Sequence, residues 1–437
     1  MALHKALNFF TLTMYGIGII VGAGIYVLVG QASGIAGNGV WISFLLGAII
    51  ASFTGLSYAE LSSAFPGASG EANYLKQAFG KDWLAFLIGW LVAVVGFIAA
   101  ATVSLGFAGY LAKIIPVPVV LTAIVLIVLL SIVDLFGITV SAKLNIVFTL
   151  LSLLGIFIII ALGIPKLGSV DYFQLNNGIT GVLGATTLIF FAYIGFEAIV
   201  KLSEETRHAR QIVPKALLAS IAITSVIYVL VAISAVSIMS PAELGASTAP
   251  LADAATRASG ADLGLVFTIV ALFAMLSTVL VDLIVTSRLI YGMGEKREFP
   301  RIITKVYKKT GAPYVAVFVA MLGAIAMAFF SDISVIAKAT TFLVFTAFLF
   351  VNLSLIAVRL KNQYYKPAFR IPLNIGRIPV TAVLGALTCG FMLLSYSLFE
   401  FGIAIVFTAI GLGIYTIEKK FGQKKTVHAK KRKWAVS

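Results

Sequence analysis

Glycine interrupts two apolar stretches of the chain, residues 16–26 and residues 190–197. An apolar helix that breaks inside a lipid bilayer leaves backbone N–H and C=O groups unpaired, and this is tolerated only where they face a cavity or a ligand. The start of a half-helix carries partial positive charge, and its end carries partial negative charge. Glycine also lets a ligand approach the backbone closely, because it has no Cβ. The two stretches therefore predict a binding site inside the membrane that suits a zwitterion.

A different interpretation of the first stretch is that Gly18 and Gly22 form a packing face between membrane helices, as small residues four apart commonly do. This interpretation leaves Gly24 unexplained, and it leaves the second break unexplained as well. We therefore favour the binding site.

Few ionisable residues fall within the apolar spans, and each is costly there unless it is paired or lies in a wet cavity. They are Glu60, Asp134, Glu197, Asp282 and Arg288. A gate in which Arg288 pairs with Glu197 or Glu60 is one hypothesis, and a permanent structural ion pair is the other. Asp134 lies at the end of a predicted helix, where we expect a structural role.

These residues do not form a recognisable enzyme centre. His4, His208 and His428 lie outside the apolar spans, whereas catalysis inside the membrane would need histidine or paired carboxylates within them. The single cysteine, Cys389, lies in an apolar span, so a disulfide framework is excluded. The sequence also lacks the repeated filter or rings of charge that are typical of channels. We predict no enzyme activity and no cofactor other than a coupling ion.

The elements that would carry these residues are membrane helices. Of the 437 residues, 60% are hydrophobic and 11% are charged, and the mean hydropathy of +1.07 excludes an ordinary soluble domain. About 20 apolar residues span the hydrocarbon as a helix. The sequence predicts about twelve such spans, at residues 9–33, 39–63, 82–110, 119–138, 142–164, 181–201, 214–239, 261–293, 313–330, 334–358, 377–396 and 399–418. We expect an all-α integral membrane protein with a single transmembrane domain at 1–418 and a basic tail at 419–437.

Lysine and arginine gather on one side of these predicted spans. The formal net charge is +15, and 27 of the 32 basic residues fall in segments on the side that holds both termini, Lys201 among them. Those on the other side are Lys113, Lys166, Arg257 and Lys338. The positive-inside rule then places both termini in the cytoplasm, with the protein in the plasma membrane. This one-sided pattern argues against nucleic acid as a partner, and we expect the lysines at residues 424–433 to contact anionic lipid headgroups.

Two polar segments outside the spans also have helical character. Residues 68–81 are amphipathic and are expected to lie along the membrane surface. Residues 251–257 form a helical piece in the loop at 240–262, where they could cap the external mouth of the site.

Several motifs resemble a known family. They are Gly22-Ala-Gly24-Ile-Tyr-Val-Leu-Val-Gly30, Ser57-Tyr-Ala-Glu60-Leu, Pro66-Gly-Ala-Ser-Gly70-Glu-Ala-Asn-Tyr74, Ala85-Phe-Leu-Ile-Gly89-Trp90, Phe191-Ala-Tyr-Ile-Gly195-Phe-Glu197 with Glu204-Glu205-Thr206 and Pro214, and Arg288 with Phe299-Pro300. Together they resemble the amino acid, polyamine and organocation (APC) superfamily, and in particular amino acid permeases of the branch that contains the cationic amino acid transporters. The resemblance implies the five-plus-five inverted-repeat fold of the bacterial leucine transporter, with discontinuous first and sixth helices. The two repeats would cover residues 9–164 and 181–358, followed by two extra helices at 377–418.

The resemblance also implies where an amino acid substrate would bind. Its carboxylate would meet backbone N–H groups at Val21, Gly22, Ala23 and Gly24, and its amino group would meet carbonyls at Phe190, Phe191, Ala192 and Ile194. The side-chain pocket would be walled by Tyr26, Phe190, Tyr193 and Phe196. This wall contains no obvious carboxylate, so neutral amino acids are favoured over basic ones.

Two coupling ions are consistent with the residues present. Proton-coupled relatives place a lysine in the fifth span and some add an acid in the third, but these positions fall on Ser152 and near Val95 here. The resemblance places a sodium site at Gly18, Val21, Ala274, Ser277 and Thr278, whose oxygens suit a hard cation. The alternative is a proton on Asp282, one helical turn beyond Thr278. Serine and threonine in membrane helices also commonly bond their own helix carbonyls, which would give Ser277 and Thr278 no ion.

The expected function is secondary active transport of amino acids by alternating access, as an ion-coupled symporter. An exchanger and an amino-acid-binding membrane sensor without net transport are the alternatives. The sequence leaves the oligomeric state open.

Overall fold

The protein is described by a computed structural model that covers residues 3–112, 114–329, 333–362, 365–394, 396 and 398–434. Side chains are described in these ranges except at residues 23, 27, 333–339, 398–399 and 420–434. Lys113 and the side chains of Ala23, Lys338 and the tail lysines at 424–433 therefore lie outside the described residues.

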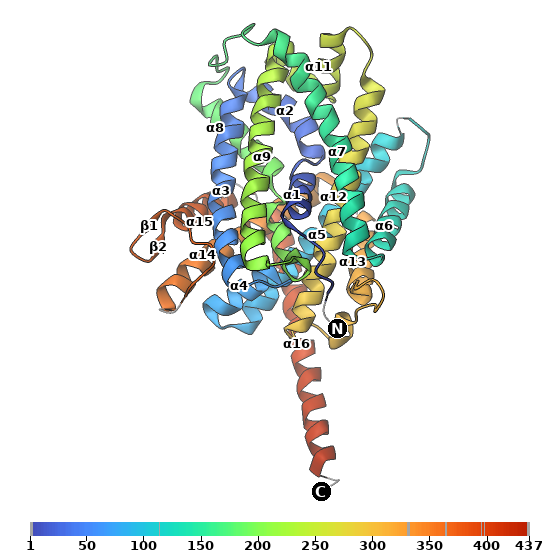
Figure 1. Cartoon of the computed structure of the whole chain (residues 1–437), viewed down its shortest axis with the longest axis vertical. Coiled ribbons are helices and arrows are strands. Elements are labelled where there is room, and N and C mark those ends of the chain that lie inside the picture. The colour runs from blue at the N-terminus through green and yellow to red at the C-terminus, as the bar shows by residue number, and fades with distance from the viewer. Residues whose placement is uncertain are drawn as a thin grey trace.

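Helices account for nearly all of the regular structure (Figure 1). In chain order they are α1 (Phe9–Ile20), α2 (Ala23–Ala36), α3 (Val40–Ala64), α4 (Gly70–Phe79), α5 (Asp82–Ala112), α6 (Val119–Leu135), α7 (Ile138–Gly163), α8 (Gly178–Tyr193), α9 (Ala209–Ile238), α10 (Pro241–Ala246), α11 (Pro250–Ser259), α12 (Gly264–Glu295), α13 (Tyr314–Ala328), α14 (Ile333–Lys361), α15 (Val380–Leu394) and α16 (Leu398–Trp434). The described chain also contains three 3-10 helices, η1 (Ile164–Lys166), η2 (Phe196–Glu205) and η3 (Arg301–Thr304), and an antiparallel hairpin of β1 (Asn374–Ile375) and β2 (Ile378–Pro379).

The lengths of these helices agree with a multi-pass membrane protein. In the described residues, eight helical segments are long and apolar enough to cross a membrane: Val40–Ala64, Asp82–Ala112, Ile138–Lys166, Gly178–Glu205, Ala209–Ile238, Gly264–Glu295, Thr340–Lys361 and Glu400–Lys419. Four shorter apolar helices, α1, α6, α13 and α15, occupy the other predicted spans. Large apolar side chains such as Leu121, Ile179 and Phe391 are exposed on the outside of the bundle, as a lipid-facing surface requires. The five-plus-five repeat and its boundaries remain predictions.

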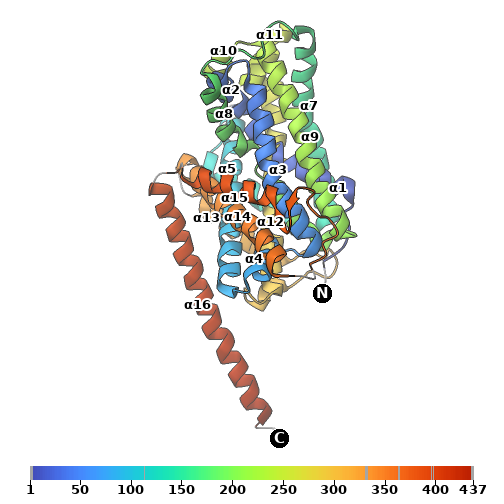
Figure 2. The same ribbon diagram turned by 90° about the vertical axis from the view of Figure 1, so that its left-hand side faces the viewer.

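Most of the helices run along the long axis of the molecule, which gives the bundle two ends. The N-terminus and α4 lie at one end, which we call the N-terminal end of the bundle, and α10 and α11 lie at the other (Figure 2). Residues 251–257 are helical as predicted, within α11. The amphipathic segment at 68–81 also forms a helix, α4, but seven of its ten residues are buried, so α4 packs into the bundle instead of lying on the membrane surface.

Both predicted breaks are present. The first falls at Val21 and Gly22, between α1 and α2, and the second falls at Ile194 and Gly195, between α8 and η2. Gly195 adopts a φ of +121°, which strongly favours glycine, and a methyl group added there would lie 3.1 Å from Ile19 Cγ1. The second break therefore lies against the first.

Two buried ion-pair networks hold the helices around the breaks. Arg288 of α12 pairs with Asp134 of α6 (Nη1 to Oδ1, 2.5 Å) and with both oxygens of Glu205 in η2 (3.0 and 3.1 Å). Arg359 of α14 donates to Glu60 of α3, with Nε 2.7 Å from Oε1. All five side chains are nearly or fully buried. Asp134 therefore has the structural role that the sequence predicts.

We expect Arg288→Met to destabilise the fold strongly, because it leaves the buried carboxylates of Asp134 and Glu205 without a positive partner. Removing one partner of such a network costs about 3 to 5 kcal/mol. Arg257→Met is the matched control, since Arg257 pairs with Glu243 on the surface, where a pair contributes about 0 to 1 kcal/mol. Thermal unfolding of the two detergent-purified variants measures the difference in Tm. Equal shifts in the two variants would contradict the structural role of the Arg288 network.

Candidate functional site

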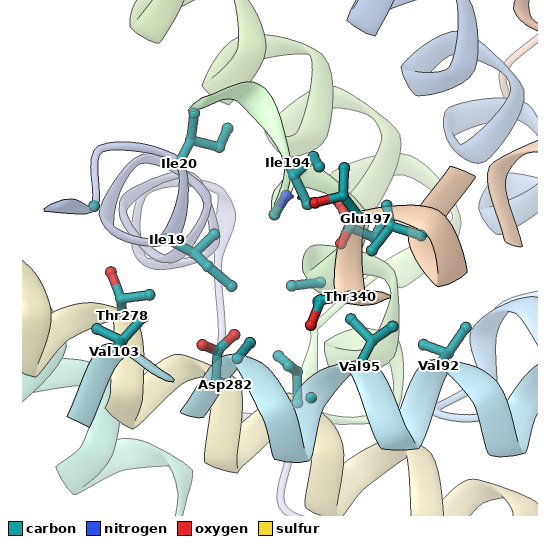
Figure 3. A pocket seen from close by; sticks show the side chains of 18 of the residues that line it. Ile19, Ile20, Val92, Val95, Val103, Ile194, Glu197, Thr278, Asp282 and Thr340 are labelled. Atoms are coloured by element: carbon teal, nitrogen blue, oxygen red, sulfur yellow. Dashed lines mark hydrogen bonds between the residues drawn. The ribbon is translucent and has the colours of Figure 1, made fainter. Parts of the chain in front are cut away.

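A cavity of about 550 Å³ lies between the two breaks and the helices α5, α12 and α14 (Figure 3). Gly22 and Gly24 line it from the first break, and Phe191, Ala192 and Ile194 line it from the second. Five of the eight predicted backbone positions thus line one cavity. Ile19, Ile20, Val92, Val95 and Val103 are among the residues that complete its apolar wall.

The chain direction at the breaks gives the cavity two poles. Gly22 is the N-cap of α2, and no side chain caps this helix. The first N–H groups of α2 therefore have no hydrogen-bond acceptor within the helix, and they lie beside the cavity. The last carbonyls of α8 end at the second break, where Phe191 O accepts from Ile194 N–H (3.2 Å). A helix start attracts an anionic group and a helix end attracts a cationic one. The cavity can therefore orient a ligand that carries both charges.

Tyr228 of α9 joins the two breaks, and sequence analysis missed it. Its hydroxyl oxygen lies 2.6 Å from the carbonyl oxygen of Ile20, at the end of α1, and 3.2 Å from that of Ala192, near the end of α8. The side chain is fully buried. A tyrosine inside an apolar span was the available signal, because a buried phenol needs a hydrogen-bond partner. Its hydroxyl thus lies between the two breaks, where its one proton can be donated to either carbonyl.

The predicted aromatic wall is wrong. Tyr193 donates from its hydroxyl to Phe44 O (3.0 Å), and Phe190 stacks on Phe345 at 5.1 Å, so both point away from the cavity. Tyr26 donates to the carbonyl of Ser152. Phe196 packs against other rings, and none of these four predicted wall residues lines the cavity. Val21, also a predicted substrate contact, does not line it either.

Carboxylates line this cavity, contrary to the prediction of a wall without them. Asp282 points into it from α12 (Figure 3) and Glu197 lines it from η2. Asp282 is 8% exposed, and its Oδ2 has no hydrogen-bond partner among the described residues. Glu197 accepts the backbone N–H of Gly195 at 2.9 Å. The lining therefore gives no reason to favour neutral over basic amino acids.

The predicted gate pairs are replaced by other contacts. Arg288 is held by Asp134 and Glu205, and Glu60 is held by Arg359. Neither Glu60 nor Arg288 lines the cavity. The pairing of Arg288 with Glu60 or Glu197 is therefore wrong for this structure, because helix rotation directs the guanidinium of Arg288 toward α6 and away from the cavity.

The residues of the predicted sodium site lie close together. A methyl group added at Gly18 would lie 2.6 Å from Ser277 Oγ, and one added at Gly22 would lie 2.8 Å from Thr278 Oγ1. Thr278 lines the cavity, whereas Ser277 lies behind it. Thr278 donates to the carbonyl of Ala274 at 3.1 Å, so its hydroxyl bonds a carbonyl of its own helix, as serine and threonine in membrane helices commonly do.

Ser277 belongs to a polar cluster that sequence analysis missed. Its hydroxyl donates to Asn145 Oδ1 (2.8 Å) and lies 3.2 Å from Thr149 Oγ1, both of α7. The fifth-span residue that reaches this cluster is thus Thr149, not Ser152. Asn145 and Thr149 are four residues apart on one face of an apolar helix, and this spacing was the available signal. The oxygens suit a cation in type, and the Ser277 hydroxyl, which donates to Asn145, still has lone pairs.

Comparison with known proteins agrees with this architecture. The chain matches the family model described as Amino acid permease over residues 7–425. It is 28% identical to the branched-chain amino acid permease BcaP of Bacillus subtilis (strain 168), over 95% of this chain and 93% of the relative. It is 26% identical to the methylthioribose transporter of the same organism, over 95% and 93%. It is 29% identical to cationic amino acid transporter 4 of Mus musculus, over 83% of this chain and 61% of that protein.

The family match covers nearly the whole chain and confirms the resemblance found in the sequence motifs. The chain belongs to the amino acid permease family, and it is a transporter and not an enzyme.

Proposed function

We propose that the protein is a secondary active transporter that moves amino acids across the plasma membrane by alternating access. The observation that carries this proposal is that the start of α2 and the end of α8 face the same cavity at Gly24 and Ala192. An α-amino acid carries the carboxylate and the ammonium group that these two poles attract. Methylthioribose carries neither group, so the cavity favours the amino acids named for the other two relatives.

In this proposal the substrate carboxylate accepts hydrogen bonds from the N–H groups at Gly22, Ala23 and Gly24. The substrate ammonium donates to the carbonyls at the end of α8, at Phe191 and Ala192. The side chain of the substrate then extends past Phe191 and Ile194 toward α5 and α12. The one-sided lysines and arginines of the sequence support a cytoplasmic N-terminus and a tail that contacts anionic lipid.

For the coupling ion we propose a proton carried by Asp282, so that transport is symport. Asp282 lines the cavity and keeps one oxygen without a partner among the described residues. Ser277 and Thr278 of the alternative sodium site instead use their hydroxyl groups in hydrogen bonds to Asn145 and Ala274. A proton needs only the free carboxylate oxygen of Asp282, whereas a sodium ion would need several oxygen ligands at once.

The substitution Gly24→Val tests the substrate site. We expect uptake of labelled amino acids into proteoliposomes to be abolished while the protein still folds. A methyl group at Gly24 would lie 3.7 Å from Leu28 Cδ1 and 3.8 Å from Ala192, which is ordinary contact, so the added side chain fills the space between the two poles. Gly184→Val in α8 is the matched control, because a methyl group there meets Ile35 Cγ2 at the same 3.7 Å and Gly184 does not line the cavity. Full uptake by the Gly24 variant would rule out this site.

The substitution Asp282→Asn tests the coupling ion. Uptake driven by an inward proton gradient should fall to background, whereas exchange of internal for external substrate, which needs no net proton movement, should continue. The control is Asp262→Asn, since Asp262 is exposed just before α12. Gradient-driven uptake that survives in the Asp282 variant would disprove the proton site, and a strict requirement for sodium would favour Ser277 and Thr278 instead.

A further inference from the structure

Lys201 lies in the cavity wall and not in a solvent-exposed segment, although its sequence position placed it with the basic residues outside the spans. Its side chain is 5% exposed, and its Nζ lies 3.2 Å from Oε1 of Glu71 in α4. Glu71 is fully buried, and the same Oε1 accepts a hydrogen bond from the Tyr58 hydroxyl of α3 at 3.0 Å. All three side chains line the cavity. The pair therefore links α4 to η2 beside the site.

The backbone brings α4 and η2 into close contact at this pair. Gly70 begins α4 with a φ of +42°, and a methyl group added there would lie 3.4 Å from Val200 Cγ2 and 3.5 Å from Lys201 Cγ. Ala68, just before α4, donates its N–H to Glu204 Oε1 at 3.0 Å. These contacts lie at the N-terminal end of the bundle, where α4 is found (Figure 1). They hold α4 against η2 at that end of the bundle.

The cavity holds more carboxylates than ammonium groups. Glu71, Glu197 and Asp282 line it with Lys201 as the basic residue among the described lining. Glu71 Oε2 and Asp282 Oδ2 each lack a hydrogen-bond partner in the described part of the chain. The ammonium of Lys201 therefore has alternative carboxylate partners within the same cavity.

A second partner matters because a buried ion pair does not separate easily. Leaving one charge buried and unpaired is strongly unfavourable. If Lys201 moves from Glu71 to Asp282 and Glu197, its charge stays paired while α4 separates from η2. Glu71 would then meet the water that enters the opened end.

From this geometry we infer that the Lys201–Glu71 ion pair is a latch that closes the cavity at the N-terminal end of the bundle, and that it opens when Lys201 exchanges Glu71 for Asp282 and Glu197. The inference rests on the proposed alternating-access function, since it assigns the contact that must break on one side. Lys201 and Glu71 act here as positioning residues for the helices, and the substrate poles remain on the backbone.

The latch is tested by the rate at which a cavity cysteine reacts with a membrane-impermeant thiol reagent. Cys389 is the only cysteine of the chain, so Cys389→Ala gives a cysteine-free background, and Val95→Cys in α5 places a reporter in the cavity wall. The reagent is applied to membrane vesicles from the side of the N-terminal end, without substrate. We expect Lys201→Met and Glu71→Gln to raise the labelling rate by about tenfold or more. Without the ion pair, a larger fraction of the molecules has the N-terminal end open, and the labelling rate rises in proportion to that fraction. Lys201→Arg should keep the parent rate.

The Asp282→Asn variant distinguishes the latch from general damage to the fold, because the two predict opposite changes in the labelling rate. The substitution removes one of the two alternative partners of Lys201, so labelling should become slower than in the parent, whereas general damage to the fold would make it faster. Lys76→Met is the matched control on α4, since Lys76 pairs with Asp82 on the surface, and it should not change the rate. Unchanged rates in the Lys201 and Glu71 variants, or faster labelling in the Asp282 variant, would overturn the latch. Because labelling is measured without transport, its failure is separate from a failure of the Gly24 uptake test.

Discussion

The phenol of Tyr228 supplies the constraint on which the rest of the site depends. Two helices end inside the apolar core, and a carbonyl group at such an end is costly unless something donates to it. Tyr228 lies within hydrogen-bonding distance of Ile20 O on one broken helix and of Ala192 O on the other. Its own helix, α9, is unbroken over 30 residues and packs along α3 and α1. Both breaks are therefore fixed against one continuous helix, and the start of α2 stays opposite the end of α8.

The cavity contains two types of charge, partial charges on the backbone and full charges on side chains. Backbone dipoles at Gly22 to Gly24 and at the end of α8 provide partial charges that cannot be lost by titration, whereas the full charges of Glu197, Lys201 and Asp282 belong to side chains around them. Fixed poles suit the carboxylate and ammonium groups that every α-amino acid shares. Mobile side-chain charges suit steps that must reverse in each transport cycle. The same small volume can thus bind a ligand and respond to it.

The sequence was sufficient to predict the helices and the two breaks, because apolar runs and interrupting glycines are local signals. It could not predict which way a side chain points after a break. The φ of +121° at Gly195 and the 3-10 winding of η2 bring Lys201 into the cavity wall, although Lys201 follows an apolar span in the sequence. The partners of Arg288 likewise depend on the rotation of α12 against α6, which sequence spacing does not specify. The family match adds the transporter class, whereas the residue contacts come from the structure.

The link between the breaks and Tyr228 also bears on how the chain is made. Ile20 leaves the ribosome about 200 residues before Tyr228, which corresponds to roughly 10 to 40 seconds at ordinary synthesis rates. During that interval the carbonyl at the end of α1 has no donor from α9. The backbone N–H groups of Ala6 and Leu7 donate to Glu205 O in the finished structure, and they lack this acceptor for almost the same interval. The first helix of the protein therefore reaches its final environment only after the middle of the chain has been inserted.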